Sequence, residues 1–178
     1  MNERAQSIRL LALDVDGVLT DGRVTYSSDG AETKSFNIKD GVGIKLLQAA
    51  GVEVAIITGR VSPMVERRAR ELGIATIVQG REDKLSALHE LCEERGFVPA
   101  DCAYMGDDLP DLAAVVAAGV GMVPADAVAE LRAAADWQAG LAGGQGAVRE
   151  ACEALLAARG ELEAMQQRLF GFTGNQRD

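Results

Sequence analysis

The sequence is poor in the residues that build histidine–thiolate metal sites and disulfide frameworks. It has one histidine and three cysteines in 178 residues. Cys92, Cys102 and Cys152 are odd in number, widely spaced and flanked by apolar residues, which predicts reduced core cysteines. The histidine, His89, lies on a predicted helix far in sequence from any ligand partner, and we interpret it as a surface residue.

Long apolar runs and blocks of positive charge are also missing. No run is long enough to span a bilayer, and the mixed charge of residues 1–9 does not resemble a secretory signal, so a cytoplasmic protein is expected. Lysine and arginine total 18 against 27 acidic residues, giving a net charge of −9, and the basic residues are scattered. This charge balance disfavours nucleic acid and anionic membrane surfaces as partners.

What the sequence has is a short apolar run, residues 10–13, that ends in Asp14 and Asp16 followed by Gly17. The run predicts a buried strand. Two carboxylates at the end of a buried strand are costly unless a cation or strong donors lie nearby. One interpretation is a pair of solvated turn acids; the other is a divalent-metal site in which one acid attacks an electrophile.

The rest of the chain alternates strand and helix patterns, without an internal repeat or an interdomain linker. Strands are expected at 10–13, 52–57, 74–78, 102–105, 119–123 and 136–138; helices are expected at 40–51 with Asp40 as cap, 62–73, 83–96, from Pro110, 127–134, 147–158 and 162–169. This alternation predicts a single α/β domain over residues 1–178, a Rossmann-like, doubly wound parallel sheet. Residues 160–178 form its C-terminal tail.

Residues 22–36 have a strand-and-turn pattern that differs from the segments around them. Two β-like segments flank Asp29-Gly30, which predicts a β-hairpin inserted after the first strand. An exposed hairpin edge needs a cover, so this segment is a candidate subunit contact.

In a doubly wound sheet, ligands bind at the carboxyl ends of the strands. Three strands are expected to end in Asp14 and Asp16, in Thr58, and in Asp107 and Asp108. Oxygen ligands without histidine or cysteine favour Mg2+. Mg2+ held by carboxylates is typical of phosphoryl transfer.

Each residue then has an expected role. Asp14 would be the nucleophile, and Asp16 would protonate the leaving oxygen and then activate water. Thr58 would donate to phosphoryl oxygens, and Lys84 would place a positive charge against the nucleophile and the phosphate. The expected metal ligands are Asp14, Asp16 and Asp107. Asp108 and Asp111 are expected either to bind the metal as well or to orient its ligands from outside the coordination shell.

The motifs Asp14-x-Asp16-Gly17, Thr58 at a strand end, Lys84 at a helix start and Gly106-Asp107-Asp108-x-x-Asp111 resemble those of the haloacid dehalogenase superfamily of phosphatases. Together they match all four motifs of that superfamily in order and spacing. The resemblance implies the same roles as above, with Asp16 contributing its backbone carbonyl to the metal.

Over residues 8 to 160 the chain further resembles the 3-deoxy-D-manno-octulosonate 8-phosphate (KDO 8-phosphate) phosphatases. The resemblance rests on segments 14–22, 39–41, 58–60, 106–109 and 143–150. It implies hydrolysis of a sugar-acid phosphate in lipopolysaccharide precursor biosynthesis, and a homotetramer in which hairpins associate and a neighbouring subunit covers each site. It also implies a cap-less fold, since the stretch between Gly17 and Asp40 is too short for a lid domain.

Several interpretations stay open. Gly59 and Arg60 are candidate substrate contacts, although Arg60 could equally form a surface ion pair; Arg149 is a candidate substrate contact or a helix-cap residue. Arg81 is interpreted as a surface residue, and residues 143–146 either cradle an anion or form a flexible loop. The alternatives for function are a phosphatase of a nine-carbon sialic- or KDN-type sugar phosphate, a phosphoacceptor receiver module, and a catalytically idle assembly module.

Overall fold

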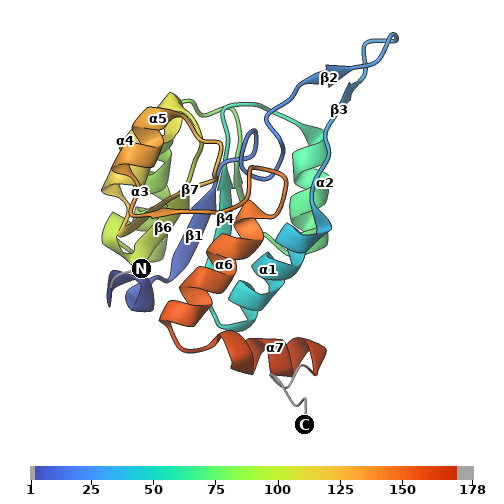
Figure 1. Ribbon diagram of the computed structural model, residues 1–178. Coiled ribbons are helices and arrows are strands. Elements are labelled where there is room, and N and C mark those ends of the chain that lie inside the picture. The colour runs from blue at the N-terminus through green and yellow to red at the C-terminus, as the bar shows by residue number, and fades with distance from the viewer. Residues whose placement is uncertain (1–2, 172–178) are drawn as a thin grey trace.

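The computed structural model describes residues 3–171 and places six parallel strands in one sheet, in the order β5-β4-β1-β6-β7-β8 (Figure 1). The strands are β1 (Leu10–Leu13), β4 (Glu53–Ile57), β5 (Thr76–Val78), β6 (Cys102–Met105), β7 (Val120–Val123) and β8 (Trp137–Gln138). The helices are α1 (Ile38–Ala49), α2 (Pro63–Leu72), α3 (Lys84–Arg95), α4 (Leu112–Ala117), α5 (Ala129–Ala134), α6 (Ala147–Ala158) and α7 (Leu162–Phe170), with short 3-10 turns at Glu3–Ser7, Pro99–Asp101 and Leu109–Asp111. The predicted doubly wound sheet is confirmed.

Helices cover both faces of the sheet, because each central strand is apolar on both sides. Leu11 and Leu13 of β1 belong to the core shared with α1, α2 and α6, whereas Leu10 and Ala12 belong to the core shared with α3, α4 and α5. β1 pairs with β4 on one side and with β6 on the other. The chain reverses its direction of winding between β1 and β6, and ligand sites of such folds lie at this point.

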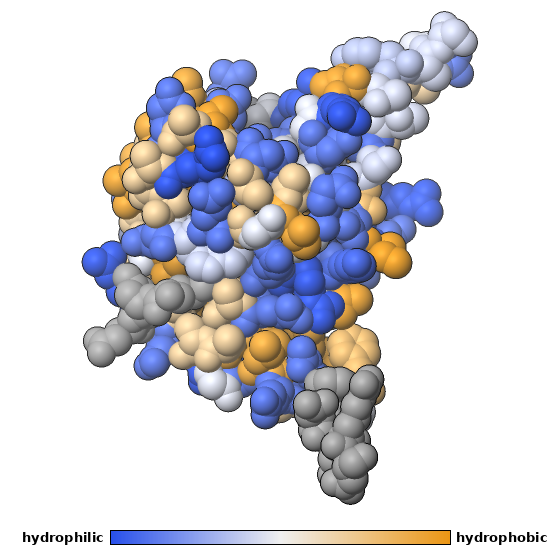
Figure 2. Space-filling model, viewed as in Figure 1, coloured by the Kyte–Doolittle hydropathy of each residue, from blue (hydrophilic) through white to orange (hydrophobic). Residues whose placement is uncertain are grey.

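The predicted hairpin is present and stands away from the body of the molecule (Figure 1). β2 (Thr25–Tyr26) and β3 (Glu32–Thr33) pair antiparallel, and Gly30, whose φ is 85°, turns the chain between them. Val24 and Tyr26 are 43% and 65% exposed. In the space-filling view the hairpin is a thin projection of mostly neutral or hydrophilic residues (Figure 2). Nothing in the described chain inserts a lid domain between β1 and α1, as the cap-less prediction requires.

Several element boundaries differ from the prediction, and one difference matters. Asp40 is not the cap of α1: the N-cap is Asn37, whose side chain accepts from the N–H of Lys39. The strands at 74–78 and 119–123 are shorter, and Pro110 lies in a 3-10 turn ahead of α4. α5 starts at Ala129 rather than at residue 127.

Asp40 instead caps a different helix. Asp40 is a buried residue in the first turn of α1. Its Oδ1 accepts a hydrogen bond of 2.9 Å from the backbone N–H of Arg149, which lies in the first turn of α6. The N-cap of α6 is Gly146, which has no side chain to do this. Gly43 lets the two helices approach, because a Cβ there would lie 2.9 Å from Arg149 Cα. Asp40 therefore ties α1 to the start of α6.

Replacing Asp40 by alanine is expected to lower the free energy of unfolding by about 1–2 kcal/mol, because the first turn of α6 loses its acceptor. Asp40→Asn keeps an oxygen at Oδ1 and should retain most of the stability. Urea unfolding of both variants measures the difference. Equal losses in the two variants would contradict a capping role.

The C-terminal tail is helical over Leu162–Phe170, where Leu162 and Met165 pack against the core and Leu169 and Phe170 are exposed. Residues 172–178 of the predicted tail lie outside the described residues. Between residues 3 and 171, no helix combines the length and the apolar character needed to cross a membrane.

Candidate active site

A pocket of about 620 Å³ opens at the carboxyl ends of β1, β4 and β6. It is lined by Asp14, Asp16, Gly22, Thr58, Gly59, Arg60, Glu82, Lys84, Asp107, Asp108, Pro110 and Asp111. All of the predicted site residues except Arg149 therefore lie around one cavity. Their convergence follows from the parallel sheet, because strand ends far apart in sequence meet at one edge.

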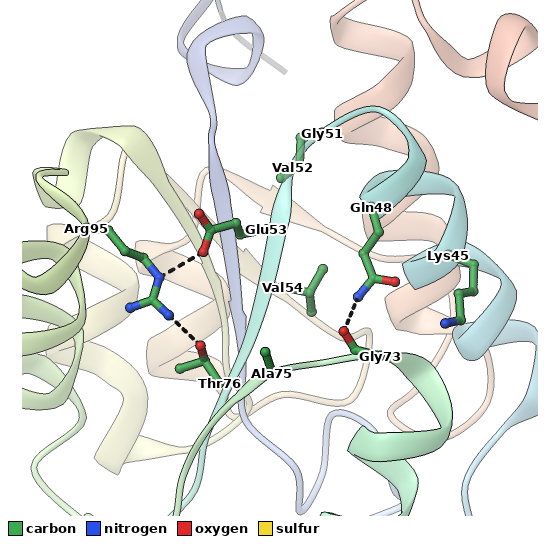
Figure 3. A pocket seen from close by; sticks show the side chains of 10 residues that line it. All are labelled: Lys45, Gln48, Gly51, Val52, Glu53, Val54, Gly73, Ala75, Thr76 and Arg95. Carbon is green, nitrogen blue, oxygen red and sulfur yellow. Dashed lines mark hydrogen bonds and ion pairs between the residues drawn. The ribbon is translucent and has the colours of Figure 1, made fainter.

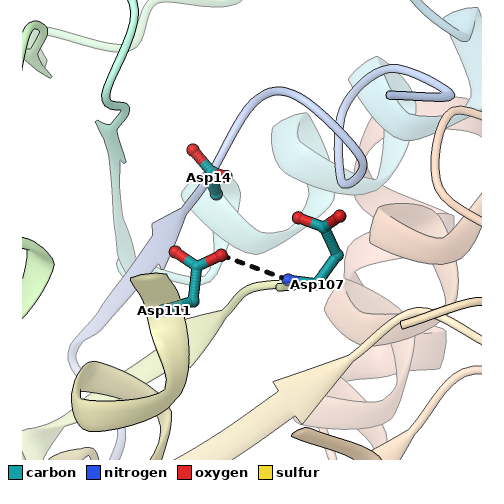
Figure 4. A group of neighbouring side chains, drawn as sticks. All are labelled: Asp14, Asp107 and Asp111. Carbon is teal, nitrogen blue, oxygen red and sulfur yellow. Dashed lines mark hydrogen bonds between the residues drawn. The ribbon is translucent and has the colours of Figure 1, made fainter. Parts of the chain in front are cut away.

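Three carboxylates face one another at the bottom of this pocket (Figure 4). Asp14, Asp107 and Asp111 each offer an oxygen, and these oxygens lie within 4.8 Å of one another. Asp14 follows β1, whereas Asp107 and Asp111 follow β6. Asp111 also orients the turn after β6, because Oδ2 accepts from the backbone N–H of Asp107 over 3.3 Å.

Lys84 is the cation at this cluster. It is the first residue of α3, its side chain is 3% exposed, and Nζ lies 2.9 Å from Asp14 Oδ1 and 3.0 Å from Asp111 Oδ1. Nζ also donates to the carbonyl of Ile57 at the end of β4. Burial alone would lower the pKa of the Lys84 ammonium, but Asp14 and Asp111 outweigh it and raise this pKa above its usual value. Lys84 is therefore a fixed positive charge beside Asp14.

Burial and mutual repulsion favour the protonated forms of the carboxylates. Desolvation, followed by the charge of Asp111, raises the pKa of Asp14 to about 6. Desolvation, followed by Asp14 and Asp111, raises the pKa of Asp107 to about 8. A divalent cation among these oxygens would reverse both shifts, and hard oxygen donors are the ligands that Mg2+ prefers. The donor set thus fits Mg2+.

Tyr104 is a member of the site that sequence reasoning missed. It is fully buried in β6, and its hydroxyl donates to Asp111 Oδ1 over 2.8 Å, the same oxygen that pairs with Lys84. Desolvation, followed by the charge of Asp111, raises the pKa of Tyr104 well above its usual value, so the hydroxyl stays a donor. In the sequence this tyrosine is one apolar-looking residue in a buried strand.

The loop after β1 must pass very close to Asp107. Gly17 has a φ of 96°, and a Cβ there would lie 2.0 Å from Asp107 Oδ2. The Thr20 hydroxyl accepts from the backbone N–H groups of Gly17 and Gly22 and holds the loop. Gly143 and Gly144 pack against its backbone, and the Gly144 N–H donates to the Val18 carbonyl over 3.0 Å. Gly143 and Gly144 therefore support this loop.

The side chain of Asp16 lines the same pocket but is not a member of the three-carboxylate cluster. Its Oδ1 contacts Lys34 Nζ closely, and its Oδ2 lies 3.9 Å from Arg60 Nε. Lys34 comes from the outgoing arm of the hairpin and was not predicted as a site residue, although lysine is rare in this chain. Arg60 also pairs with Glu32 of β3 over 2.9 Å.

Thr58 and Gly59 follow β4 at the pocket wall. Thr58 is 2% exposed, and its Oγ1 accepts from the Arg60 N–H over 3.4 Å. Arg60 lines the pocket and forms ion pairs with Asp16 and Glu32; its contact with a substrate stays a prediction.

Four other residues lie apart from the cluster. Arg149 pairs with Glu153 one turn along α6 and does not line the pocket. Asp108 is exposed and accepts from the Leu109 N–H over 2.7 Å. Arg81 pairs with Glu90, and His89 is exposed, as expected of surface residues. The three cysteines are free and buried, which confirms that prediction.

A second hollow, of about 500 Å³, lies at the amino ends of β4 and β5 (Figure 3). Here Arg95 pairs with Glu53 over 2.8 Å and donates to Thr76, and Gln48 donates to the Gly73 carbonyl. These groups satisfy one another, which is typical of a structural contact. The pocket at the carboxyl ends of the strands has the ionisable cluster.

Comparison with known proteins agrees with this geometry. A family model described as haloacid dehalogenase-like hydrolase matches residues 37–119, a range that contains Thr58, Lys84 and Asp107. The 3-deoxy-D-manno-octulosonate 8-phosphate phosphatases of Salmonella typhi and Escherichia coli K12 are each 46% identical over 160 residues, which cover 90% of this chain and 85% of the relative. The chain belongs to this family of haloacid dehalogenase-like hydrolases.

Solved structures of family members have the same fold. The phosphatase from Moraxella catarrhalis, in complex with magnesium, phosphate and KDO, superimposes with a TM-score of 0.91 at 48% identity, covering 93% of this chain and 95% of that chain. A probable phosphatase from Pseudomonas syringae gives a TM-score of 0.91 at 49% identity, covering 93% and 94%. The predicted haloacid dehalogenase-type α/β fold is confirmed.

Proposed function

We propose that this family member is a Mg2+-dependent phosphatase that hydrolyses KDO 8-phosphate to KDO and phosphate, through an aspartyl-phosphate, in lipopolysaccharide precursor biosynthesis. The observation that carries the proposal is the placement of Asp14, whose carboxylate lies 2.9 Å from the Lys84 ammonium and within 4.8 Å of carboxylate oxygens of Asp107 and Asp111. The names of the 46% identical relatives, and the Moraxella structure with its magnesium, phosphate and KDO, support the choice of substrate.

The metal would be held by Asp14 and Asp107, with the backbone of Asp16 as the third protein ligand. The Asp16 carboxylate faces Lys34, which leaves the backbone carbonyl as its contribution. Asp111 and Asp108 would orient the turn that carries Asp107. When bound, Mg2+ supplies positive charge that offsets the charge of the phosphoryl group and of the carboxylates.

Asp14 would attack the phosphorus, and the bond from phosphorus to the sugar oxygen would break. Asp16 would give its proton to that oxygen and take one back from the water that hydrolyses the aspartyl-phosphate. Thr58 and Lys84 would hold the phosphoryl oxygens, as they lie at the pocket wall beside Asp14. These groups are preorganised by burial, so little reorganisation is needed in the transition state.

Gly59 and Arg60 would contact the substrate, since both line the pocket. Arg149 remains a proposed substrate contact only if a neighbouring subunit or a rearrangement brings it to a site, because it pairs with Glu153 in its own chain.

We further propose a cytoplasmic homotetramer of single-domain subunits, with no nucleic-acid or membrane partner. The projecting hairpin supports the subunit contact, because a two-stranded sheet alone is marginally stable in water. Association would also exclude water from a pocket that has no lid of its own.

The function is tested by phosphate release from a panel of sugar phosphates with Mg2+. The panel contains KDO 8-phosphate, nine-carbon sialic- and KDN-type 9-phosphates, and a hexose 6-phosphate. We expect the highest kcat/KM for KDO 8-phosphate. A higher value for a nine-carbon substrate would overturn the substrate assignment and leave the phosphatase chemistry standing.

Stabilisation by Mg2+ is expected to grow with pH. Because the pKa of Asp107 is raised to about 8, the folded protein holds this proton more tightly than the unfolded chain, and its stability without Mg2+ falls as pH rises toward that value. Protons and Mg2+ compete for the same oxygens. The gain in Tm on adding Mg2+ should be larger near pH 8.5 than near pH 5.5, by about several degrees. An equal gain in Tm at both pH values would mean that the cation does not bind at Asp107. Asp107→Asn is the matched control.

A further inference from the structure

Four charged side chains form a closed ring between the hairpin and the pocket. Lys34 Nζ contacts Asp16 Oδ1, and Asp16 Oδ2 lies 3.9 Å from Arg60 Nε. Arg60 Nη2 lies 2.9 Å from Glu32 Oε2, and Glu32 Oε1 lies 3.6 Å from Lys34 Nζ. Two members come from the hairpin and its outgoing arm, and two come from the strand ends.

The members of the ring differ in exposure. The side chain of Lys34 is 2% exposed, whereas those of Asp16 and Arg60 are 22% and 45% exposed. A buried ammonium that contacts a carboxylate interacts strongly with it, while a solvated guanidinium at 3.9 Å interacts weakly. Lys34 is therefore the partner that fixes the Asp16 carboxylate.

Among the described residues, Lys34 is the one side chain that donates a hydrogen bond to Asp16. Lys34 takes Oδ1 and leaves Oδ2, which Arg60 approaches only at a distance beyond hydrogen bonding. The contact thus distinguishes the two oxygens of the carboxylate.

We propose that Lys34 is a positioning residue for proton transfer by Asp16, through which the hairpin of each subunit orients the acid–base group of its own site. The inference rests on the proposed phosphatase function. Oδ2 is the oxygen left to pass a proton to the departing oxygen as the bond to phosphorus breaks, and to receive one from the attacking water in the second step. Lys34 itself exchanges no proton.

The test is kcat/KM of Lys34→Gln with a series of para-substituted phenyl phosphates, beside KDO 8-phosphate. The aryl substrates are alike in shape and differ in the pKa of the leaving phenol. The value of kcat/KM depends only on the steps up to and including departure of the leaving group, so it does not depend on the later attack of water on the aspartyl-phosphate. A misplaced general acid lowers kcat/KM most for the substrate whose leaving oxygen is most basic, because that oxygen most needs a proton.

We expect Lys34→Gln to lose about tenfold or more in kcat/KM with KDO 8-phosphate and with the most basic phenol. The loss should shrink to about threefold or less with p-nitrophenyl phosphate, whose leaving group needs little protonation. Lys34→Arg should recover part of the loss, since a cationic donor is kept. Glu32→Gln should show a smaller loss with the same dependence on the leaving group.

Arg23→Gln is the matched control, because it removes one positive charge from the incoming arm of the hairpin. Between residues 3 and 171, Asp21 is the one acidic side chain that pairs with Arg23. Arg23→Gln should leave the whole series unchanged. If Lys34→Gln and Glu32→Gln unfold like wild type but lose the same factor in kcat/KM with every substrate, their role is structural and the inference is overturned. An effect of Lys34→Gln confined to KDO 8-phosphate would also overturn it. So would an unchanged kcat/KM throughout the series. Failure of the wild type with KDO 8-phosphate, in contrast, would overturn only the substrate assignment.

Discussion

Replacing Asp14 by asparagine is expected to remove at least about 10³-fold of kcat with KDO 8-phosphate, because the variant has no carboxylate oxygen to attack phosphorus. Asparagine is close in size to aspartate, so the packing around residue 14, which is 8% exposed, should survive. Steady-state phosphate release with Mg2+ measures the loss.

Asp14→Asn is also expected to keep or increase stability near neutral pH. The buried Asp14 charge is unfavourable there, since burial and Asp111 raise its pKa to about 6. Loss of turnover with stability retained would place Asp14 in the chemistry. Full turnover in a variant verified by mass spectrometry would exclude it as the nucleophile.

Replacing Lys84 by methionine is expected to have the largest effect on stability, about 3–5 kcal/mol, together with loss of turnover. Removing one partner from a buried ionic cluster leaves the others uncompensated. Asp14 and Asp111 both lie within about 3 Å of the Lys84 ammonium and would then repel one another.

The destabilisation of Lys84→Met should depend on pH in a defined direction. Lys84 is one of the groups that lower the pKa of Asp14, so this pKa, about 6 in the wild type, is higher in Lys84→Met. As pH rises above about 6, the variant therefore goes on losing stability relative to its unfolded chain, where Asp14 is already ionised, and the wild type does not. The deficit in unfolding free energy should therefore be larger near pH 8 than near pH 5. Lys39→Met, which removes an exposed ammonium from α1, is the control and should stay within about 0.5 kcal/mol of wild type. A pH-independent deficit would argue that Lys84 contributes by packing alone.

The sequence predicted the sheet and most of the site for one physical reason. Apolar runs of strand length, separated by helical patterns, have few stable arrangements other than a doubly wound sheet. In that topology the residue after each strand points to the same edge, so Asp14, Thr58 and Asp107 could be brought together without knowledge of any distance. Lys84 followed because it opens a helix at the same edge.

The residues that sequence reasoning missed depend on tertiary packing. Tyr104 looks like a core residue of β6, and its hydroxyl matters only because Asp111 lies above it. Lys34 reaches Asp16 because the outgoing arm of the hairpin folds back on the body, an orientation that no local pattern encodes.

Asp40 was misjudged for a similar reason. It precedes an apolar periodic run, as an N-cap does, but Asn37 three residues earlier takes that position, and Asp40 caps α6 instead. The substrate contact of the Arg149 side chain stays a prediction; what the sequence does not reveal is that the backbone N–H of Arg149 is the group that Asp40 caps.

The central claim is that phosphate passes through Asp14. A rapid acid quench during turnover of KDO 8-phosphate, followed by pepsin digestion at low pH and mass spectrometry, tests it directly. With p-nitrophenyl phosphate, whose leaving group needs little protonation, Asp16→Asn lacks the base for the second step and should increase the yield. Phosphate on the peptide that contains Asp14, absent from Asp14→Asn, is the predicted result. Sustained turnover with no phosphate on that peptide, or with phosphate on another residue, would contradict the account.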